Sequence, residues 1–235
     1  MATRLSSGLL VNPGDLTQNT ANAAVQLGAV AFDQAGNRYR YVKAGGTSLV
    51  PGKLQQASAE VTADQGLACA AAAIGAVTVT TTSTVTVTAN QYAGGWLIVT
   101  ITPGQGYKYL ISSHPAATGA AVTLTLSDPL VVALTTDSRL DLVANPYSGV
   151  IVNPASASSA PIGAAITAVT NAQFGWIQDA GVAALLADGT VTVGTGVVAS
   201  NATAGAVEAL TGVQAPVGIA LTGGATTDYS AILLK

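Results

Sequence analysis

Charged side chains are scarce in this sequence. Lys, Arg, Asp and Glu together make up 8% of its 235 residues, whereas soluble proteins average about 25%. Hydrophobic residues reach 49% but aromatic residues only 5%, so the apolar content is mostly Ala and Val. The surface of a soluble monomer normally carries roughly a quarter to a third charged side chains, which this chain cannot supply. Either the surface is unusually neutral or partner molecules bury much of it, and we favour the second explanation because neutral surfaces rich in Ala and Val tend to associate.

The shortage of basic residues argues against nucleic acid as a partner, because nucleic-acid-binding proteins need a dense basic patch and usually a high pI. The net charge is −3. Five of the eight basic residues nevertheless lie within the first 53 positions, and from Asp179 onward four acids accompany one base, Lys235. This uneven distribution predicts a docking end and a solvent-exposed end. The five basic residues are Arg4, Arg38, Arg40, Lys43 and Lys53.

A single cysteine and the lack of long hydrophobic runs limit the cellular context. Cys69 is alone, so the chain has no internal disulfide and no CxxC metal site. The opening MATRLSSGLLVNPGDL lacks the apolar core of a signal peptide. The apolar stretch 67–77 is too short for a bilayer span, which takes about 20 residues. We expect synthesis in the cytoplasm and no membrane partner.

Residues with catalytic chemistry are few, and we expect neither an enzyme nor a bound cofactor. His114 is the only histidine, and no GxSxG motif accompanies Ser112 or Ser113. A loop histidine that caps a turn before Pro115 is the simpler interpretation. Asp137 and Asp141 could be paired glycosidase carboxylates, but they flank Arg139, and a local charge ladder explains them more simply.

Alternating residues indicate an all-β protein. Val77, Val79, Val85 and Val87 alternate with threonines over 78–88, the pattern of a half-buried strand. Short strands separated by Gly, Pro and Asp-Pro turns predict a barrel or a sandwich. Further strands are expected at 29–33, 38–44, 96–102, 107–112, 121–127, 139–143, 149–153, 174–178, 182–187, 190–193, 215–221 and 229–234.

Two stretches rich in Ala, Ser and Pro indicate an insertion. We predict a β-barrel or sandwich body from residues 24–56 plus 166–235, with residues 77–152 as an inserted β-module. The linkers would be 57–76 and 153–165, and residues 1–23 would be an extended N-terminal arm that reaches a neighbouring molecule.

The stretch GNRYRYVKAGG, residues 36–46, concentrates three of the eight basic residues. On a strand Arg38 and Arg40 share one face, while Tyr39, Tyr41 and Lys43 share the other. Tyr and Arg are enriched at binding hot spots, so this strand is a candidate partner-binding surface, together with Arg4 and Lys53. The alternative is an ordinary amphipathic strand with its tyrosines in the core and its arginines in water.

A threonine face at 78–88 could also bind a regular lattice such as ice or a carbohydrate. Such an array needs the two-residue threonine spacing on several adjacent strands, and in this sequence that spacing occurs essentially once. We therefore expect a solvated strand face.

Several segments resemble structural proteins of tailed bacteriophages. AGGWL, YLISSHPA, LSDPL and NPYSGVI, within 92–152, are similar to the middle of that family. RYRYVKAGGTSLVPGKLQQ (38–56) is similar to its N-terminal part, and FGWIQDAGVAALLADGT, PVGIAL and YSAILLK to its C-terminal end. The Ala/Thr-rich stretch 57–90 departs from the pattern. These motifs are turns and packing residues rather than catalytic signatures.

The resemblance implies a virion component, most simply a head decoration or cement protein on the outer capsid surface. Its partners would be the major capsid protein and further copies of itself, as a trimer or alternatively a dimer. The competing interpretation is a tail, fibre or host-surface protein that binds glycans, with Trp96 and Trp176 as stacking platforms. Both tryptophans lie in strand-like or turn contexts that a core role explains more simply.

Overall fold

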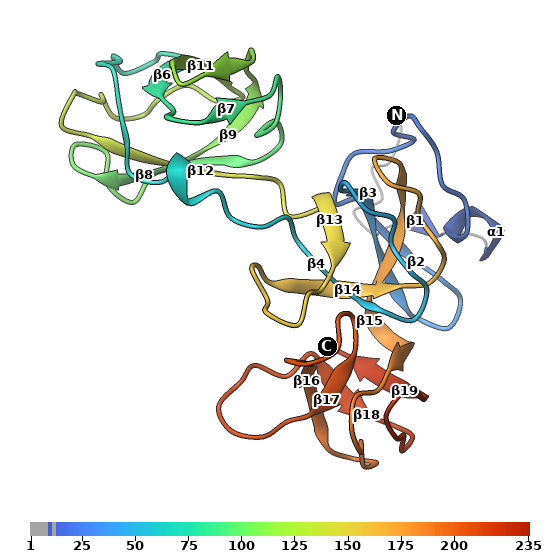
Figure 1. The fold of residues 1–235 in the computed structure, drawn as a ribbon. Coiled ribbons are helices and arrows are strands. Elements are labelled where there is room, and N and C mark those ends of the chain that lie inside the picture. The colour runs from blue at the N-terminus through green and yellow to red at the C-terminus, as the bar shows by residue number, and fades with distance from the viewer. Residues whose placement is uncertain (1–8, 11–12) are drawn as a thin grey trace. The chain divides into compact units, whose positions relative to one another are not determined.

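The computed structural model describes residues 9–10 and 13–235 and confirms an all-β fold. Strands account for 43% of the residues and helices for 3%, and the sheets are barrel-like. The chain forms two compact units. Unit 1 combines the chain up to Ala59 with Pro146–Lys235, and unit 2 is the segment Glu60–Asn145 inserted between them (Figure 1).

The first half of unit 1 is a ring of five paired strands. β3 pairs with β13 on one side and with β15 on the other, and the pairs β13–β4, β4–β14 and β14–β15 complete the circuit. Small and branched side chains fill it, among them Val42, Val150 and Ile177. The strands are β3 (Arg38–Ala44), β4 (Leu54–Gln56), β13 (Ser148–Val152), β14 (Pro161–Ala165) and β15 (Phe174–Leu186).

The second half of unit 1 is another barrel-like sheet that begins on the far end of β15. The order continues from β15 through β19, β18, β16 and β17, and a bridge between Ala187 and Val207 leads back toward β15. Its core includes Leu185, Val197 and Ile232. The bounds are β16 (Gly196–Ala199), β17 (Val207–Ala209), β18 (Gly218–Ala220) and β19 (Tyr229–Leu234).

The thirteen-residue strand β15 serves both sheets because it bends between them. Its pairing with β3 shifts register between Gln178 and Ala180, which is a β-bulge. Gly181 follows at φ 93°, and a Cβ there would lie 2.2 Å from Oδ1 of Asn37. Only glycine fits this position. Two strands were expected here, at 174–178 and 182–187, and the bend explains why the sequence looks interrupted.

The segment before β3 lies on the outer side of the first sheet. Leu16, in the short helix α1 (Pro13–Leu16), packs with Tyr39, Tyr41 and Trp176. Thr20 and Phe174 exchange backbone hydrogen bonds of 3.0 and 2.9 Å. Leu16 and Thr20 of the expected arm thus contact their own chain, because the outer faces of β3 and β15 are apolar and need a cover. Two further strands, β1 (Leu9–Leu10) and β2 (Val30–Phe32), pair in parallel.

Unit 2 has a six-stranded sheet in the order β5-β12-β8-β9-β11-β6. A bridge between Cys69 and Thr81 joins its two ends, and Leu97, Ile111 and Leu124 lie in its core. The strands β7 and β10 pair with each other and form a separate two-stranded antiparallel sheet. The bounds are β5 (Leu67–Ala68), β6 (Thr78–Thr82), β7 (Thr86–Val87), β8 (Trp96–Ile101), β9 (Lys108–Ser113), β10 (Ala117–Thr118), β11 (Ala121–Leu126) and β12 (Arg139–Val143), with a 3₁₀ turn at Thr62–Asp64.

The insertion is present, but its boundaries differ from the expected 77–152. Residues 60–76 of the expected linker 57–76 belong to unit 2, since β5 pairs with β12 and Leu67 is buried. Ser148–Val152 belongs to unit 1 because β13 pairs with β3 and β4. The expected linker 153–165 contains β14, a ring strand. The strands β5 and β14 were not predicted because their segments are rich in Ala and Gly, which have a low intrinsic strand propensity. Pairing with neighbouring strands overrides that low propensity in the fold.

Candidate functional site

Arg38 and Arg40 share one acidic partner. Nε of Arg38 donates to Oδ1 of Asp179 at 2.9 Å, and Nε of Arg40 donates to Oδ2 at 2.8 Å. The side chains of Arg38 and Arg40 are 38% and 24% exposed, and that of Asp179 is 10% exposed. Hydrogen bonding and charge from Asp179 raise the pKa of Arg38. We call Arg38 and Arg40 the arginine pair.

Two further contacts hold Arg40 in place. Its Nη1 donates to the carbonyl of Gly28 at 3.1 Å, and its guanidinium carbon lies 5.5 Å from the ring centroid of Tyr147. A Cβ on Gly28 would lie 2.7 Å from the same ring, so glycine lets the ring approach this closely. The arginine pair is therefore anchored from several elements.

Sequence reasoning did not identify Asp179 as the partner of the arginine pair. Asp179 sits at the β15 bulge, between Gln178 and Ala180, which pair with Tyr39 and Arg38. The bulge places the carboxylate beside both arginines at once. The available signal was a lone acid in the otherwise uncharged strand sequence FGWIQDAGVAALL.

Both tyrosines of this strand lie inside the protein. Tyr39 is 6% exposed and donates to Oδ2 of Asp33 at 2.9 Å. Burial and that hydrogen bond raise the pKa of Tyr39 to about 12. Tyr41 is 3% exposed, and its hydroxyl accepts from the backbone N–H of Ala24 at 2.9 Å. Their positions match the alternative interpretation of an amphipathic strand, so the tyrosines offer no outer surface to a partner.

The other expected binding residues do not join the arginine pair. The ammonium of Lys43 lies 5.4 Å from the ring centroid of Phe174, a residue of the apolar cluster that also contains Tyr41. The stem of Lys53 lies against Gly205, where a Cβ would be 2.7 Å from Cβ of Lys53. Arg4 lies outside the described residues.

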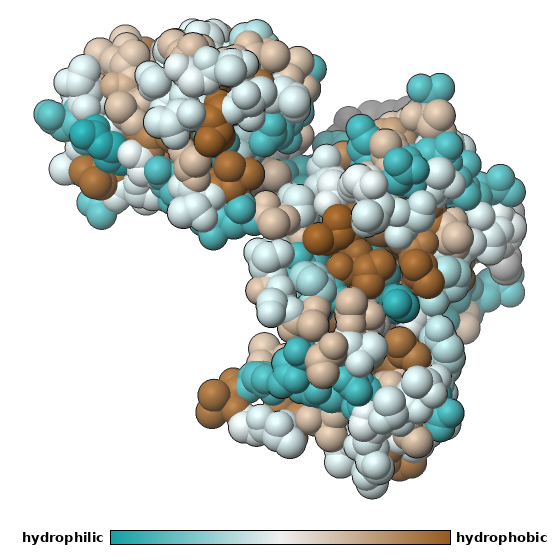
Figure 2. Space-filling view, viewed as in Figure 1, coloured by the Kyte–Doolittle hydropathy of each residue, from teal (hydrophilic) through white to brown (hydrophobic). Residues whose placement is uncertain are grey.

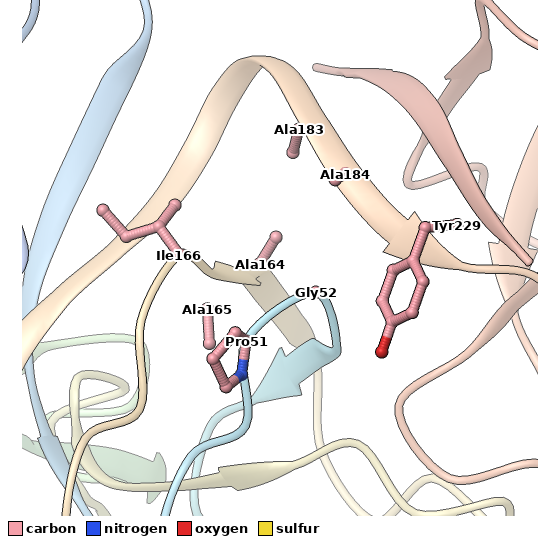
Figure 3. Close-up of a pocket in the computed structure, with 8 residues that line it drawn as sticks. All are labelled: Pro51, Gly52, Ala164, Ala165, Ile166, Ala183, Ala184 and Tyr229. Carbon is pink, nitrogen blue, oxygen red and sulfur yellow. The ribbon is translucent and has the colours of Figure 1, made fainter.

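An apolar depression opens between the two sheets of unit 1. Its volume is about 410 Å³. β15 arches over it, and the ring of Tyr229 stands at one side above the Pro51–Gly52 turn (Figure 3). A Cβ on Gly52 would lie 2.3 Å from Cε1 of that ring. Ala and Ile side chains supply most of the wall, with no charged group among the lining residues Pro51, Gly52, Ala164, Ala165, Ile166, Ala183, Ala184 and Tyr229.

Large apolar side chains are exposed on both units. Figure 2 shows brown, hydrophobic areas among mostly pale residues. On unit 2 the backbone of Gly75 donates to Leu130 at 2.8 Å, and this contact brings together Ile74 (68% exposed) and Val131 (58%) on neighbouring loops. On unit 1 the most exposed is Val213 (105%), followed by Val193 (61%) and Tyr229 (55%).

Unit 2 contains a buried polar cluster around Asp64. The carboxylate is fully buried and accepts hydrogen bonds from the hydroxyls of Ser83 and Tyr92. Burial and the bond to Asp64 raise the pKa of Tyr92. His114 is 4% exposed, and its Nε2 accepts from the backbone N–H of Tyr92 at 2.9 Å. His114 therefore has a structural role, but it is buried and holds the backbone at Tyr92 rather than capping a surface turn before Pro115.

The remaining sequence candidates have structural contacts. Oδ1 of Asp141 accepts from the backbone of Gly66 at 2.7 Å, and Arg139 donates to Thr136 at 2.9 Å. Trp176 is 6% exposed and so offers no stacking face, and Trp96 is covered in part by Lys108 at 4.6 Å from its ring centroid.

The threonine face expected over 78–88 is shorter along the chain, because β6 ends at Thr82 and β7 pairs with β10 in a separate sheet, but it is wider across the sheet. β11 pairs with β6 so that Thr123 lies opposite Thr80 and Thr125 opposite Thr78. The hydroxyls of Thr80 and Thr123 are 3.0 Å apart. The spacing therefore occurs on two adjacent strands rather than one, and cross-strand Thr pairs of this kind stabilise a sheet.

Comparison with known proteins adds no functional assignment. In the part of the chain that the structure describes, no three His, Cys, Asp or Glu side chains gather as a metal site requires. Within the same residues, no helix is long and apolar enough to cross a membrane. Searches against protein-family models, curated proteins and solved structures found no match for this chain.

Proposed function

We propose that this protein is a structural component of a tailed-bacteriophage head. It would bind the outer surface of the expanded shell as a decoration protein and bridge neighbouring major capsid subunits. The motifs at 92–152 and near both ends of the chain support the proposal by their resemblance to phage structural proteins.

The observation that carries the proposal is a protein surface with few charged side chains and several exposed apolar ones. With 8% charged residues, the chain exposes large side chains such as Val193 and Tyr229 on unit 1 and Ile74 on unit 2. Extended neutral and apolar surfaces mark sites of association. A protein that repeats over a lattice covers such surfaces with neighbouring subunits, and its work needs a stiff scaffold and contacts rather than a reactive group.

Stabilisation of the shell then follows from mass action. A ligand that binds only the expanded lattice stabilises it by about 2.7 kcal/mol per site when its concentration is a hundredfold above Kd. If the protein is a trimer, several weak contacts act together, and avidity adds a factor of about 10² to 10⁴. Bridged subunits resist the outward pressure of packaged DNA.

Cosedimentation with phage shells tests this function. Purified protein is mixed with expanded heads of the virus that encodes it, and with unexpanded precursor shells as the control. We expect saturable binding to the expanded heads only, at a fixed ratio to the major capsid protein. Absence of binding to either form would refute the proposal, and binding to tails instead would favour the tail or fibre alternative.

A further inference from the structure

Among the residues that the structure describes, the acceptors of the arginine pair engage only a minority of its N–H donors. Each guanidinium carries five N–H donors. Asp179 and the carbonyl of Gly28 accept three bonds from the two side chains, two from Nε atoms and one from Nη1 of Arg40. Nε is the donor nearest the side-chain stem, so the bonds to Asp179 leave the Nη groups of Arg38 and, apart from the bond from Nη1 to Gly28, those of Arg40 for other acceptors.

The charges around the arginine pair do not cancel. Two cations meet one carboxylate, Asp179, in ion pairs of 2.9 and 2.8 Å. The nearest other acid on the β2–β3 hairpin is Asp33, which is engaged by the hydroxyl of Tyr39 and the backbone of Asn37. Lys43 lies on the opposite face of the same strand, against Phe174, and does not contribute to this site. One positive charge therefore remains at a site that is only partly exposed.

The arginine pair is also held before any partner arrives. Asp179 fixes both side chains, and the contacts with Gly28 and Tyr147 restrain Arg40. Ordering a long side chain at an interface normally costs about 0.5–1.5 kcal/mol, and here the fold has already done much of that ordering. Partial burial strengthens charge-assisted hydrogen bonds, and the planar fork of Arg matches a carboxylate.

We propose that Arg38 and Arg40, held side by side by Asp179, form a docking site for an Asp or Glu carboxylate presented by the protein to which this chain binds. The proposal rests on the proposed function for the identity of that protein, the shell subunit. A nucleic-acid phosphate fits less well, because the chain carries a net charge of −3 and only eight Lys and Arg residues, whereas nucleic-acid sites need a dense basic surface.

Solution NMR of the intact protein tests the site without a shell. The probes are a short peptide containing Glu-Glu with blocked ends, the same peptide with Gln-Gln, and inorganic phosphate. We expect the Glu peptide to shift the Nε–H signals of Arg38 and Arg40 in a saturable way, and the Gln peptide to leave them unchanged. No response to the Glu peptide, or tighter binding of phosphate, would overturn the proposal.

Matched variants separate the arginine pair from net charge. Combining Arg38→Gln, Arg40→Gln and Asp179→Asn lowers the net charge by one without leaving a buried carboxylate unpaired. Lys108→Gln, on unit 2, lowers it by the same amount. We expect the triple variant to bind the Glu peptide about tenfold more weakly or worse, and Lys108→Gln to bind like the wild type. Arg38→Lys with Arg40→Lys keeps the charge and should also weaken binding, because Lys lacks the fork.

Shell binding distinguishes this inference from the proposed function. If wild type and triple variant occupy expanded heads equally, the carboxylate site is wrong and the decoration role stands. If the Glu peptide binds the arginine pair but wild type does not bind heads, the site stands and the decoration role is wrong.

Discussion

Asp33 shows how a single carboxylate organises the strand that carries the arginine pair. Both of its oxygens accept hydrogen bonds, from the backbone and side chain of Asn37 and from the hydroxyl of Tyr39. Burial of Asp33 raises its pKa, but these hydrogen bonds outweigh the burial and hold the pKa below its ordinary value of 3.8. The loop between β2 and β3 is therefore closed by an ionised side chain.

Replacing Asp33 by Asn should make the stability of unit 1 less dependent on pH. A carboxylate whose pKa is lower in the folded state stabilises the fold above its unfolded pKa, and the effect is lost as pH falls through the folded pKa. We expect Asp33→Asn to cost about 1 kcal/mol at pH 7. The difference from wild type should narrow below pH 3.8. Urea unfolding across pH measures it, and a constant difference from pH 7 to pH 2 would contradict the role given to Asp33.

Asp179 should matter more to stability than other acids of unit 1. Asp179→Asn removes the partner of two half-buried guanidinium groups, and breaking such a pair costs about 3 kcal/mol when it is well buried. Because the arginine pair is partly exposed, we expect a loss of about 1–2 kcal/mol. Glu208→Gln is the control with the same change of charge. Equal effects of the two variants on urea unfolding would show that Asp179 acts only through net charge.

At the scale of elements, the sequence predicted strands wherever branched and aromatic residues alternate. The hairpin at 29–44 and the strands β8, β9, β11, β12 and β19 lie where expected. The expected strand at 190–193 is reduced to a bridge at Val191, and β16 was not anticipated. The partner of the arginine pair was not predictable either, because only the register of β3 and β15 and the bulge between them place Asp179 there.

The bend in β15 should depend on Gly181. Its φ of 93° strains any other residue, and an added Cβ would lie 2.2 Å from Oδ1 of Asn37. We expect Gly181→Ala to destabilise unit 1 by about 2 kcal/mol, from strain and from the displaced Asn37. Gly189→Ala is the matched control, since Gly189 has φ 74° with open space around it, and should cost about 1 kcal/mol from backbone strain alone.

Thermal or urea unfolding of both variants gives the comparison. If Gly181→Ala lowers the free energy of unfolding by no more than Gly189→Ala does, the side chain of Asn37 can move aside without cost. The bend would then not require a glycine for steric reasons.

At the scale of the whole molecule, unit 2 is inserted into a closed ring of strands without opening it. β4 leads into unit 2 and β13 leads out, and the two pair antiparallel with Gln56 opposite Ile151. The entry and exit of the insertion therefore lie close together, and each unit keeps its own core. The sequence predicted an insertion from its flanking Ala/Ser/Pro-rich stretches but not where it ends, because those stretches themselves contain β5 and β14.

Removal of unit 2 should leave unit 1 folded. Replacing Glu60–Asn145 by a flexible linker of roughly four residues would join β4 to β13 as a hairpin. We expect the shortened protein to unfold at a midpoint within a few degrees of the unit 1 transition of the full chain. Calorimetry and the amide NMR spectrum measure this. Loss of the dispersed unit 1 signals would mean that unit 1 needs unit 2 to fold.

The proposed role as a head decoration protein is tested most directly by electron cryomicroscopy of the phage particles to which the proposal assigns this chain. The account predicts repeated density on the outer face of the capsid lattice that fits unit 1, with the arginine pair beside an acidic side chain of a major capsid subunit. Heads that carry no such density, or density confined to the tail, would contradict it.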